Sequence, residues 1–336
     1  MSNNLNLLTE LPKGFFEIKS QNIKKIFPKP SLIYLKGSKQ EPLFISILLH
    51  GNEYSGLIIM QNILKKYVDN LPRPIWLMIA NVNAAEKNCR YLEGQVDFNR
   101  AWPSTLMQEN ATTRLMQETF DIVSKDGLFA FVDIHNNTGI SPHYSCITNV
   151  NKDNMYLAAL FNHFAITFKW PKGVSTMAFD NICPAVILEC SKPGNTVAIE
   201  HAVSLIDGLL HLDHFPKKTF SEHDLQLVET FATIKVSNGV SFDFGINENV
   251  DLYFDFNFEK LNFSEIKKGT VIAHTKVTKP LIALNQKGKD IADEVFSIKN
   301  NKVYVNKTYI ISMITSEKKI IAQDCLCYLL EDYSWI

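Results

Sequence analysis

The stretch LLHGNEYSG, residues 48–56, places two ionisable side chains where an apolar run gives way to a second pattern. The preceding PLFISIL (42–48) is short and apolar, which predicts a buried strand, and GLIIMQNILKKYV (56–68) has the spacing of an amphipathic helix. His50 and Glu53 fall in the turn between them. A buried strand gains no stability from ending in two ionisable groups, so a shared function is expected of them.

The composition is that of a globular protein with a hydrophobic core and no excess of charge. The chain has 336 residues, of which 46% are hydrophobic and 21% are charged, enough for a full-sized core. Its 34 basic and 35 acidic residues give a net charge of −1, so it generates no field that would hold a polyanion, and nucleic acid is not an expected partner.

The sequence also bears on location. No apolar stretch approaches the roughly 18 residues of a membrane span, and the N-terminal residues lack the basic and apolar regions of a signal peptide. The six cysteines include no CxxC pair, which indicates reduced thiols in a core. We therefore expect a cytoplasmic protein without a membrane partner.

Up to about residue 218 the chain alternates between strand and helix patterns. The expected strands are 31–36, 43–49, 74–80, 128–134, 144–148 and 185–190. The expected helices are 55–68, 111–125 and 195–212, the last with Asn195 or Thr196 as its N-cap. This alternation predicts an α/β catalytic domain, residues 1–218, with a largely parallel or mixed sheet flanked by helices.

After about residue 218 the pattern changes. Short β-rich segments are broken by Gly, Asn and Pro, for example VDLYFDFNF (250–258), GTVIAHTKV (269–277) and CLCYLL (325–330). These segments predict a second, mostly antiparallel domain, residues 219–336, with the polar segment 214–224 as its boundary.

Polar side chains recur at the ends of three predicted strands. His50 and Glu53 follow the first, His135 ends LFAFVDI and is followed by NNTG, and Glu189 stands near the end of AVILEC (185–190). In open α/β sheets, ligands bind beyond the carboxyl ends of the strands. We therefore expect these four side chains to lie at one edge of the sheet.

Two histidines and one carboxylate that leave a fourth position open are typical of a hydrolytic zinc site. His50, Glu53 and His135 are the expected ligands of one Zn²⁺ per chain, and Glu189 is the expected general base and acid. Asp133 would share a strand face with His135 and could orient an imidazole.

The segment between the first two ligand regions ends in DFNRAWP (97–103). Arg100 offers a planar guanidinium that can grip a carboxylate, and Asn99 offers an amide beside it. Arg90 is suited to polarising a scissile carbonyl or holding the developing oxyanion. A surface ion pair is the alternative for any one of these arginines.

Taken together, the motifs resemble those of the succinylglutamate desuccinylase/aspartoacylase family, within the zinc-carboxypeptidase-like superfamily. HGNEYSG resembles the family's HGNExxG motif, CRYLEGQVDFNRAWP its arginine-bearing segment, DIHNNTG its third-ligand motif and AVILEC the strand of its catalytic glutamate. LNFSEIKKGTVIAH (261–274) resembles the C-terminal β-domain of the desuccinylases. The resemblance covers roughly residues 30–330.

The resemblance implies a zinc-dependent amidohydrolase that splits a small N-acyl amino acid into a carboxylate and a free amino acid. It implies zinc binding by His50, Glu53 and His135, and activation of water by Glu189. It also implies assistance at the carbonyl by Arg90. For Asn99 and Arg100 it implies binding of a substrate carboxylate, and it makes a homo-oligomer plausible.

Three departures from the family bear on the substrate. MAFDNICPAVILE (177–189) lacks the arginine that aspartoacylases carry about ten residues before the glutamate, which argues against acetylaspartate. Cys190, Ser191 and Lys192 stand where a glycine-containing turn is common, and Lys192 either holds an anionic acyl group or is simply solvated. His143, where desuccinylases also carry a histidine, either lines the pocket or is structural.

Two other functions remain open from the sequence. The same zinc site would serve a metallocarboxypeptidase that acts on a short peptide. The scaffold would also suit a noncatalytic binding protein, although the presence of Glu189 with all three expected ligands argues against that reading.

Overall fold

The computed structural model describes residues 5–68, 70–217 and 224–334, which form two compact units. The first unit comprises Met1–Asn136, His143–Ile166 and Pro171–Gln226, and the second comprises Asn137–Pro142, Thr167–Trp170 and Leu227–Ile336. The predicted boundary between residues 218 and 219 lies outside the described residues.

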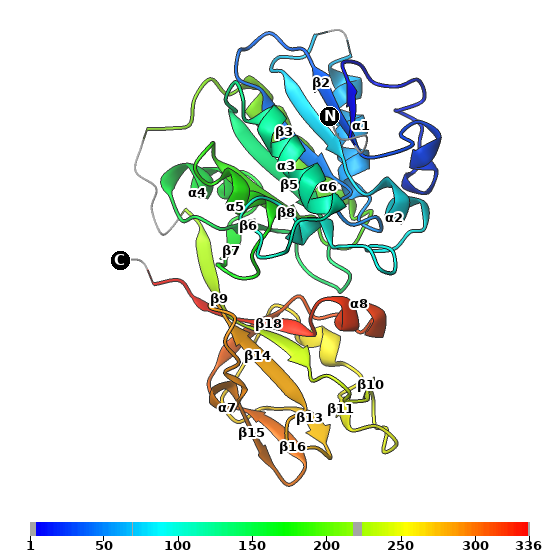
Figure 1. The fold of residues 1–336 in the computed structure, drawn as a ribbon. Helices are drawn as coiled ribbons and strands as arrows, with labels where there is room; N and C mark the ends of the chain where they lie inside the picture. Colours follow the sequence, from blue (N-terminus) through cyan, green and yellow to red (C-terminus); the bar gives the residue numbers. More distant parts are fainter. Residues whose placement is uncertain (1–4, 69, 218–223, 335–336) are drawn as a thin grey trace. The chain divides into compact units, whose positions relative to one another are not determined.

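The first unit is built on a mixed sheet (Figure 1). In spatial order its strands are β1 (Asn6–Leu8), β2 (Ser31–Leu35), β4 (Ile75–Ile79), β3 (Leu43–Ile47), β5 (Ala130–His135), β8 (Ala185–Glu189), β6 (Tyr144–Ile147) and β7 (Phe164–Thr167). The pairs β4–β3, β3–β5 and β5–β8 are parallel, whereas β2–β4 and β8–β6 are antiparallel. The predicted α/β fold with a mixed sheet is confirmed.

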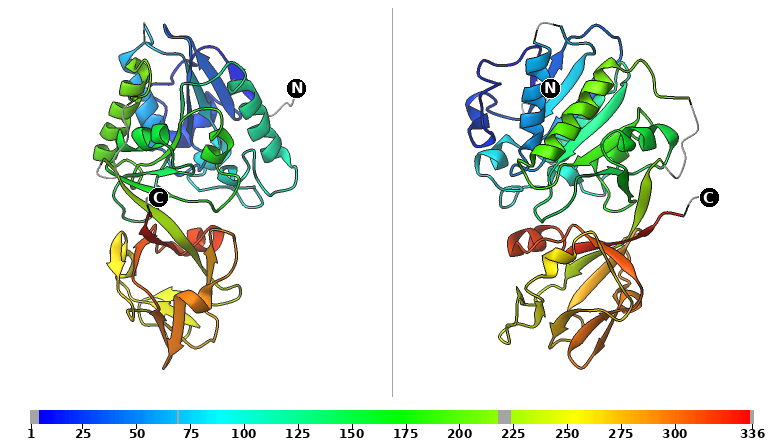
Figure 2. Two further views of the ribbon diagram at one scale, coloured as in Figure 1. Left: turned by 90° about the vertical axis from the view of Figure 1, so that its left-hand side faces the viewer. Right: turned by 180° about the vertical axis from the view of Figure 1, so that it is seen from behind.

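Helices cover both faces of this sheet. They are η1 (Ser20–Lys25), α1 (Ser55–Lys66), α2 (Val82–Glu86), η2 (Phe98–Arg100), α3 (Ala111–Val123), α4 (Lys152–Ala159), α5 (Ser175–Phe179) and α6 (Thr196–His211). Figure 2 shows α1 and α6 side by side on one face and α3 on the other. The side chain of Asn195 caps α6 by accepting from the backbone N–H of Ala198, one of the two N-caps that the sequence allowed.

Residues from far apart in the sequence form the core on the α3 face. Phe44, Trp102, Phe131 and Phe179 are fully buried and pack ring against ring, with the centroids of Phe131 and Phe179 4.5 Å apart. The central strands β3 and β5 are buried along their whole length. This rigid layer fixes the positions of the strand ends, where the polar residues stand.

The second unit is mostly antiparallel. One of its sheets contains β14 (Leu281–Asn285), β9 (Gln226–Val236), β18 (Cys327–Asp332), β17 (Tyr309–Ser312) and β12 (Ser264–Ile266). The other contains β10 (Phe242–Phe244), β11 (Leu252–Phe254), β13 (Val271–Thr275), β16 (Lys302–Val305) and β15 (Phe296–Lys299), with β10 and β11 parallel. Short helices η3 (Phe258–Leu261), α7 (Ala292–Val295) and α8 (Lys318–Gln323) complete the unit, which has its own apolar core.

Within the described ranges, every helix is too short or too polar to cross a membrane.

Candidate functional site

The turn after β3 is shaped by two residues with unusual backbone demands. β3 ends at Ile47, two residues earlier than predicted, because Leu48 adopts the left-handed conformation (φ +58°). A Cβ atom at Gly51 would lie 2.1 Å from backbone atoms of Ala84 and Ala85, so only glycine lets α2 approach this closely. The turn is thereby held against α2, and it presents His50 and Glu53 at the strand end.

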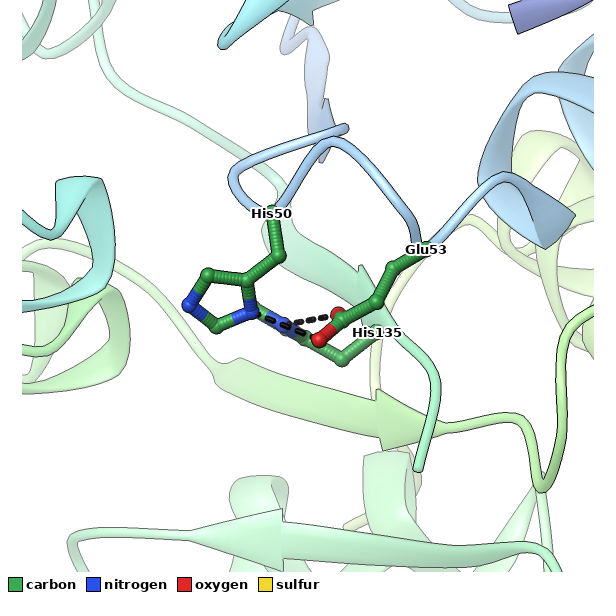
Figure 3. Close-up of side chains that lie close together, drawn as sticks. All are labelled: His50, Glu53 and His135. Atoms are coloured by element: carbon green, nitrogen blue, oxygen red, sulfur yellow. Dashed lines mark hydrogen bonds and ion pairs between the residues drawn. The ribbon is translucent and has the colours of Figure 1, made fainter. Parts of the chain in front are cut away.

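His50, Glu53 and His135 converge into one buried cluster (Figure 3). Nδ1 of His50 lies 2.7 Å from Oε1 of Glu53, and Nδ1 of His135 lies 2.8 Å from Oε2 of the same carboxylate. One donor atom from each residue falls within 4.8 Å of the others. Two imidazoles and a carboxylate are a donor set that zinc accepts, so these residues fit a zinc ion.

An aspartate stands behind each imidazole. Nε2 of His50 lies 3.1 Å from Oδ1 of Asp97, and Nε2 of His135 lies 3.1 Å from Oδ2 of Asp133. Carboxylates in this position orient ligating imidazoles in metal sites. Asp133 is fully buried and accepts hydrogen bonds from the hydroxyls of Ser46 (2.5 Å) and Ser175. The position of Asp133 beside the His135 ring agrees with the prediction that it could orient an imidazole.

The charges of the cluster favour ionised side chains. Burial alone would raise the pKa of Glu53, but the imidazoles of His50 and His135 outweigh burial and hold that pKa well below its usual range. Burial opposes protonation of His135, yet Asp133 and Glu53 raise its pKa well above the usual value. The pKa of His50 is also raised, because Glu53 and Asp97 outweigh burial and the charge of Arg90. A divalent cation would supply the positive charge that these protons otherwise provide.

Glu189 is the last residue of β8 and lies opposite His135 in the parallel β5–β8 pair. Burial raises the pKa of Glu189 to about 7, with a further contribution from the charge of Glu53 and an opposing one from His135. A carboxylate with a pKa near neutrality can both accept and donate a proton, which is the property needed for general acid–base catalysis.

Arg90 reaches the same cluster from the segment after α2. Its Nη2 donates to Oδ2 of Asp97 (3.2 Å), and its Nη1 lies 3.9 Å from Oε1 of Glu53. Burial opposes ionisation of Asp97, but the charges of His50, Arg90 and Arg100 hold its pKa well below the usual range.

Asn99 and Arg100 lie in η2, directly after Asp97. The side-chain oxygen of Asn99 is buried and has no hydrogen-bond partner among the described residues, an exception to the usual pairing of buried polar atoms. Nη1 of Arg100 donates to the backbone carbonyl of Asn99 (2.8 Å), which ties the two neighbours together.

His143 and Lys192 have other surroundings. The ring of His143 packs against Phe161, and its Nε2 lies 3.1 Å from Nδ1 of His201 on α6. Burial and the charge of His201 lower the pKa of His143. Lys192 is exposed in the turn between β8 and α6. The contacts of His143 are those of a residue packed against α6, and a substrate-binding role for either residue stays a prediction.

Asn136 is a site residue that the sequence did not single out. Its backbone N–H donates to Oε2 of Glu53 (3.1 Å), and its side chain bonds the backbone N–H of Ser55 and the carbonyls of Cys190 and Ser191. One buried amide thus joins the ends of β3, β5 and β8. The only signal in the sequence was its position directly after His135.

Similarity to solved structures shows the same fold. The succinylglutamate desuccinylase of Vibrio parahaemolyticus superposes with a TM-score of 0.60 at 12% sequence identity, covering 90% of this chain and 86% of that one. The succinylglutamate desuccinylase of Chromobacterium violaceum gives a TM-score of 0.57 at 14% identity, with 89% and 86% covered. Murine aminoacylase 3 gives a TM-score of 0.52 at 14% identity, with 88% and 97% covered. No curated protein matches the chain in sequence.

The fold and the buried His–Glu–His cluster define an α/β protein with the architecture of the desuccinylases. Residues 40–179 match the family described as "Succinylglutamate desuccinylase/Aspartoacylase catalytic domain". The family predicted from the motifs is confirmed. The matched segment contains His50, Glu53 and His135, whereas Glu189 lies beyond it.

Proposed function

We propose that this protein is a zinc-dependent amidohydrolase that cleaves the amide bond of a small N-acyl amino acid, with one zinc ion held by His50, Glu53 and His135. The observation that carries the proposal is the convergence of these three buried donors, within 4.8 Å, beside a glutamate whose pKa is raised to about 7. The family match and the names of the structural neighbours support a deacylase.

When bound, zinc would supply a Lewis acid at the scissile carbonyl and lower the pKa of water toward about 7. Glu189 accepts a proton from the attacking water and later donates it to the leaving amine. Arg90 extends a guanidinium beside Glu53, where it donates hydrogen bonds to the carbonyl oxygen as negative charge develops there.

The remaining residues bind the substrate. Arg100 binds its carboxylate through the planar guanidinium, together with the amide of Asn99 beside it. Phe179 is buried in the aromatic core, in the segment where aspartoacylases carry an arginine for the second carboxylate of their substrate, which supports a substrate other than acetylaspartate. In this proposal Lys192 would hold an anionic acyl group, and His143 would line the pocket.

All six cysteines are free, and five of them are buried, which supports reduced thiols and a cytoplasmic location. The homo-oligomer that the resemblance makes plausible stays a prediction.

A hydrolysis screen tests the proposed function. Zinc-loaded protein is given N-acyl amino acids that vary in both halves, together with short peptides, and released amine is measured. We expect turnover of at least one acyl amino acid, loss of turnover after chelation, and recovery when zinc is returned. Turnover of peptides alone would favour the carboxypeptidase. Full activity in the chelated protein would contradict the zinc mechanism.

A further inference from the structure

Asp97 has no role in the proposed function, yet its carboxylate contacts three residues of the site. Its Oδ1 accepts a hydrogen bond from the backbone N–H of Asn99 (2.8 Å) and lies 3.1 Å from Nε2 of His50. Its Oδ2 accepts from Nη2 of Arg90 (3.2 Å). One nearly buried carboxylate thus contacts an expected metal ligand on one side and the guanidinium expected at the carbonyl on the other.

The backbone reinforces this arrangement. The carbonyl of Arg90 accepts a hydrogen bond from the N–H of Gly51 (3.1 Å), in the turn that carries His50. Asp97 is 47 residues from His50 in the sequence, and it also provides the N-cap of η2. The side chains of Asp97 and Arg90 are only 12% and 10% exposed, so water competes little for their ion pair.

We propose that Asp97 is a positioning residue that holds His50 and Arg90 in a single frame, so that the metal ligand and the carbonyl-polarising group keep a fixed separation. The assignment rests on the proposed function for the roles of His50 and Arg90. Asp97 itself acts through its neighbours and does not contact the reacting atoms.

Asp133 provides the matched comparison within the same site. Its Oδ2 lies 3.1 Å from Nε2 of His135, the same distance that separates Asp97 from Nε2 of His50, but its hydrogen bonds come from the hydroxyls of Ser46 and Ser175. An Asp133→Asn variant therefore alters support of an imidazole and leaves the Arg90 ion pair in place.

The Asp97→Asn substitution can keep the contact with His50 while it removes the contact with Arg90. With zinc on Nδ1, the Nε2 of His50 carries a hydrogen, so it and the N–H of Asn99 are both donors. In Asp97→Asn the amide oxygen can accept hydrogen bonds from both of these donors. The NH₂ group of the amide then faces the guanidinium of Arg90, and since both groups are donors they form no hydrogen bond. Asp97→Ala removes both contacts.

Two measurements that need no substrate test the proposal. The first is zinc affinity, by competition with a chromophoric chelator, for the wild-type protein and the Asp97→Ala, Asp97→Asn and Asp133→Asn variants. Loss of a carboxylate behind a ligating imidazole weakens metal binding by about 10- to 100-fold. We expect this loss for Asp97→Ala and a smaller one for Asp97→Asn.

The second measurement is the ¹⁵N spectrum of the guanidinium groups, with Arg90 assigned by Arg90→Lys. We expect slowly exchanging Nη hydrogens of Arg90 in the wild-type protein and in Asp133→Asn, and their loss in Asp97→Asn. The proposal would be overturned if the Nη hydrogens of Arg90 exchanged as slowly in Asp97→Asn as in the wild-type protein. Unchanged zinc affinity in a folded Asp97→Ala variant would also overturn it.

If Asp97→Ala does not fold, the ¹⁵N spectrum of Asp97→Asn still tests whether Asp97 holds Arg90. A protein that shows both effects but cleaves no acyl amino acid would refute the proposed substrate and leave the role of Asp97 standing.

Discussion

Glu189 lies directly opposite His135 in the parallel pairing of β5 and β8, so the expected base and an expected metal ligand occupy adjacent strand ends. This placement sets Glu189 next to the cluster, although Glu189 is not one of the three residues of the His–Glu–His set.

Glu189→Gln is therefore expected to abolish proton transfer and retain zinc. A positioned general base contributes about 10²- to 10⁴-fold, so kcat should fall by at least about 100-fold. Zinc affinity should stay within a few-fold of the wild-type value. Steady-state kinetics and chelator competition measure the two quantities, with Glu200→Gln, an exposed glutamate on α6, as the control. Comparable activity in Glu189→Gln and Glu200→Gln would remove Glu189 from the mechanism.

The raised pKa of Glu189 makes the stability of the metal-free protein depend on pH. Burial raises this pKa from 4.5 to about 7, so between these values the folded protein keeps a proton that the unfolded chain releases. The corresponding stability is present below pH 4.5 and is lost as the pH rises through 7. Relative to Glu189→Gln, the wild-type protein should lose up to about 3 kcal/mol of unfolding free energy across this window.

Urea denaturation of the metal-free proteins at several pH values measures this difference. Glu200→Gln should follow the wild-type curve, because this side chain is exposed. A wild-type advantage over Glu189→Gln that stays constant from pH 4.5 to 8 would show that Glu189 titrates normally.

Ser191 adopts a left-handed backbone conformation (φ +56°) directly after Cys190, where family members often have a glycine-containing turn. This conformation costs an L-residue about 1–2 kcal/mol, and glycine avoids that cost while adding about 0.4–1 kcal/mol of unfolded-state entropy. Ser191→Gly should therefore raise the unfolding free energy by up to about 1 kcal/mol. Ser204→Gly, the same change inside α6, should lower it by about 1 kcal/mol. Equal losses in both variants, measured by urea denaturation, would contradict this account.

Much of the site could be predicted because its residues stand at pattern changes. His50, His135 and Glu189 each end an apolar run, and parallel strands bring such ends to one edge. The strand predicted over residues 43–49 ends two residues earlier, at Ile47, because Leu48 adopts a left-handed conformation that a leucine gives no reason to expect.

The supporting residues were harder to predict, since their importance comes from contacts made only in the folded chain. Asn136 bonds the carbonyl of Cys190, 54 residues away, and no local pattern marks that partner. Asp97 was visible as the first residue of DFNR, but its contact with His50 depends on how the segment after α2 folds back. β7 and α5 were also missed; they are only 4 and 5 residues long, too short to show a clear period.

Arg73 caps the carboxyl end of α6 and allows a prediction about stability alone. Its guanidinium is buried over the ring of Phe129, and it donates to the carbonyls of Glu41 (2.7 Å), Leu209 (3.1 Å) and Leu212 (2.6 Å). Hydrogen bonds from a charged donor are worth about 1.5–3 kcal/mol each, and the last carbonyls of a helix have no partner within the helix.

Arg73→Met should leave these carbonyls without their donor and lower the unfolding free energy by about 3 kcal/mol or more. Arg73→Lys should recover only part of that loss, because an ammonium cannot reach all three acceptors with the planar geometry of a guanidinium. The control is Lys66→Met, which removes a partner of the exposed Lys66–Asp207 pair and should cost less than about 1 kcal/mol. Denaturation midpoints and slopes measure all three variants, and an Arg73→Met loss no larger than that of Lys66→Met would show that α6 does not depend on this cap.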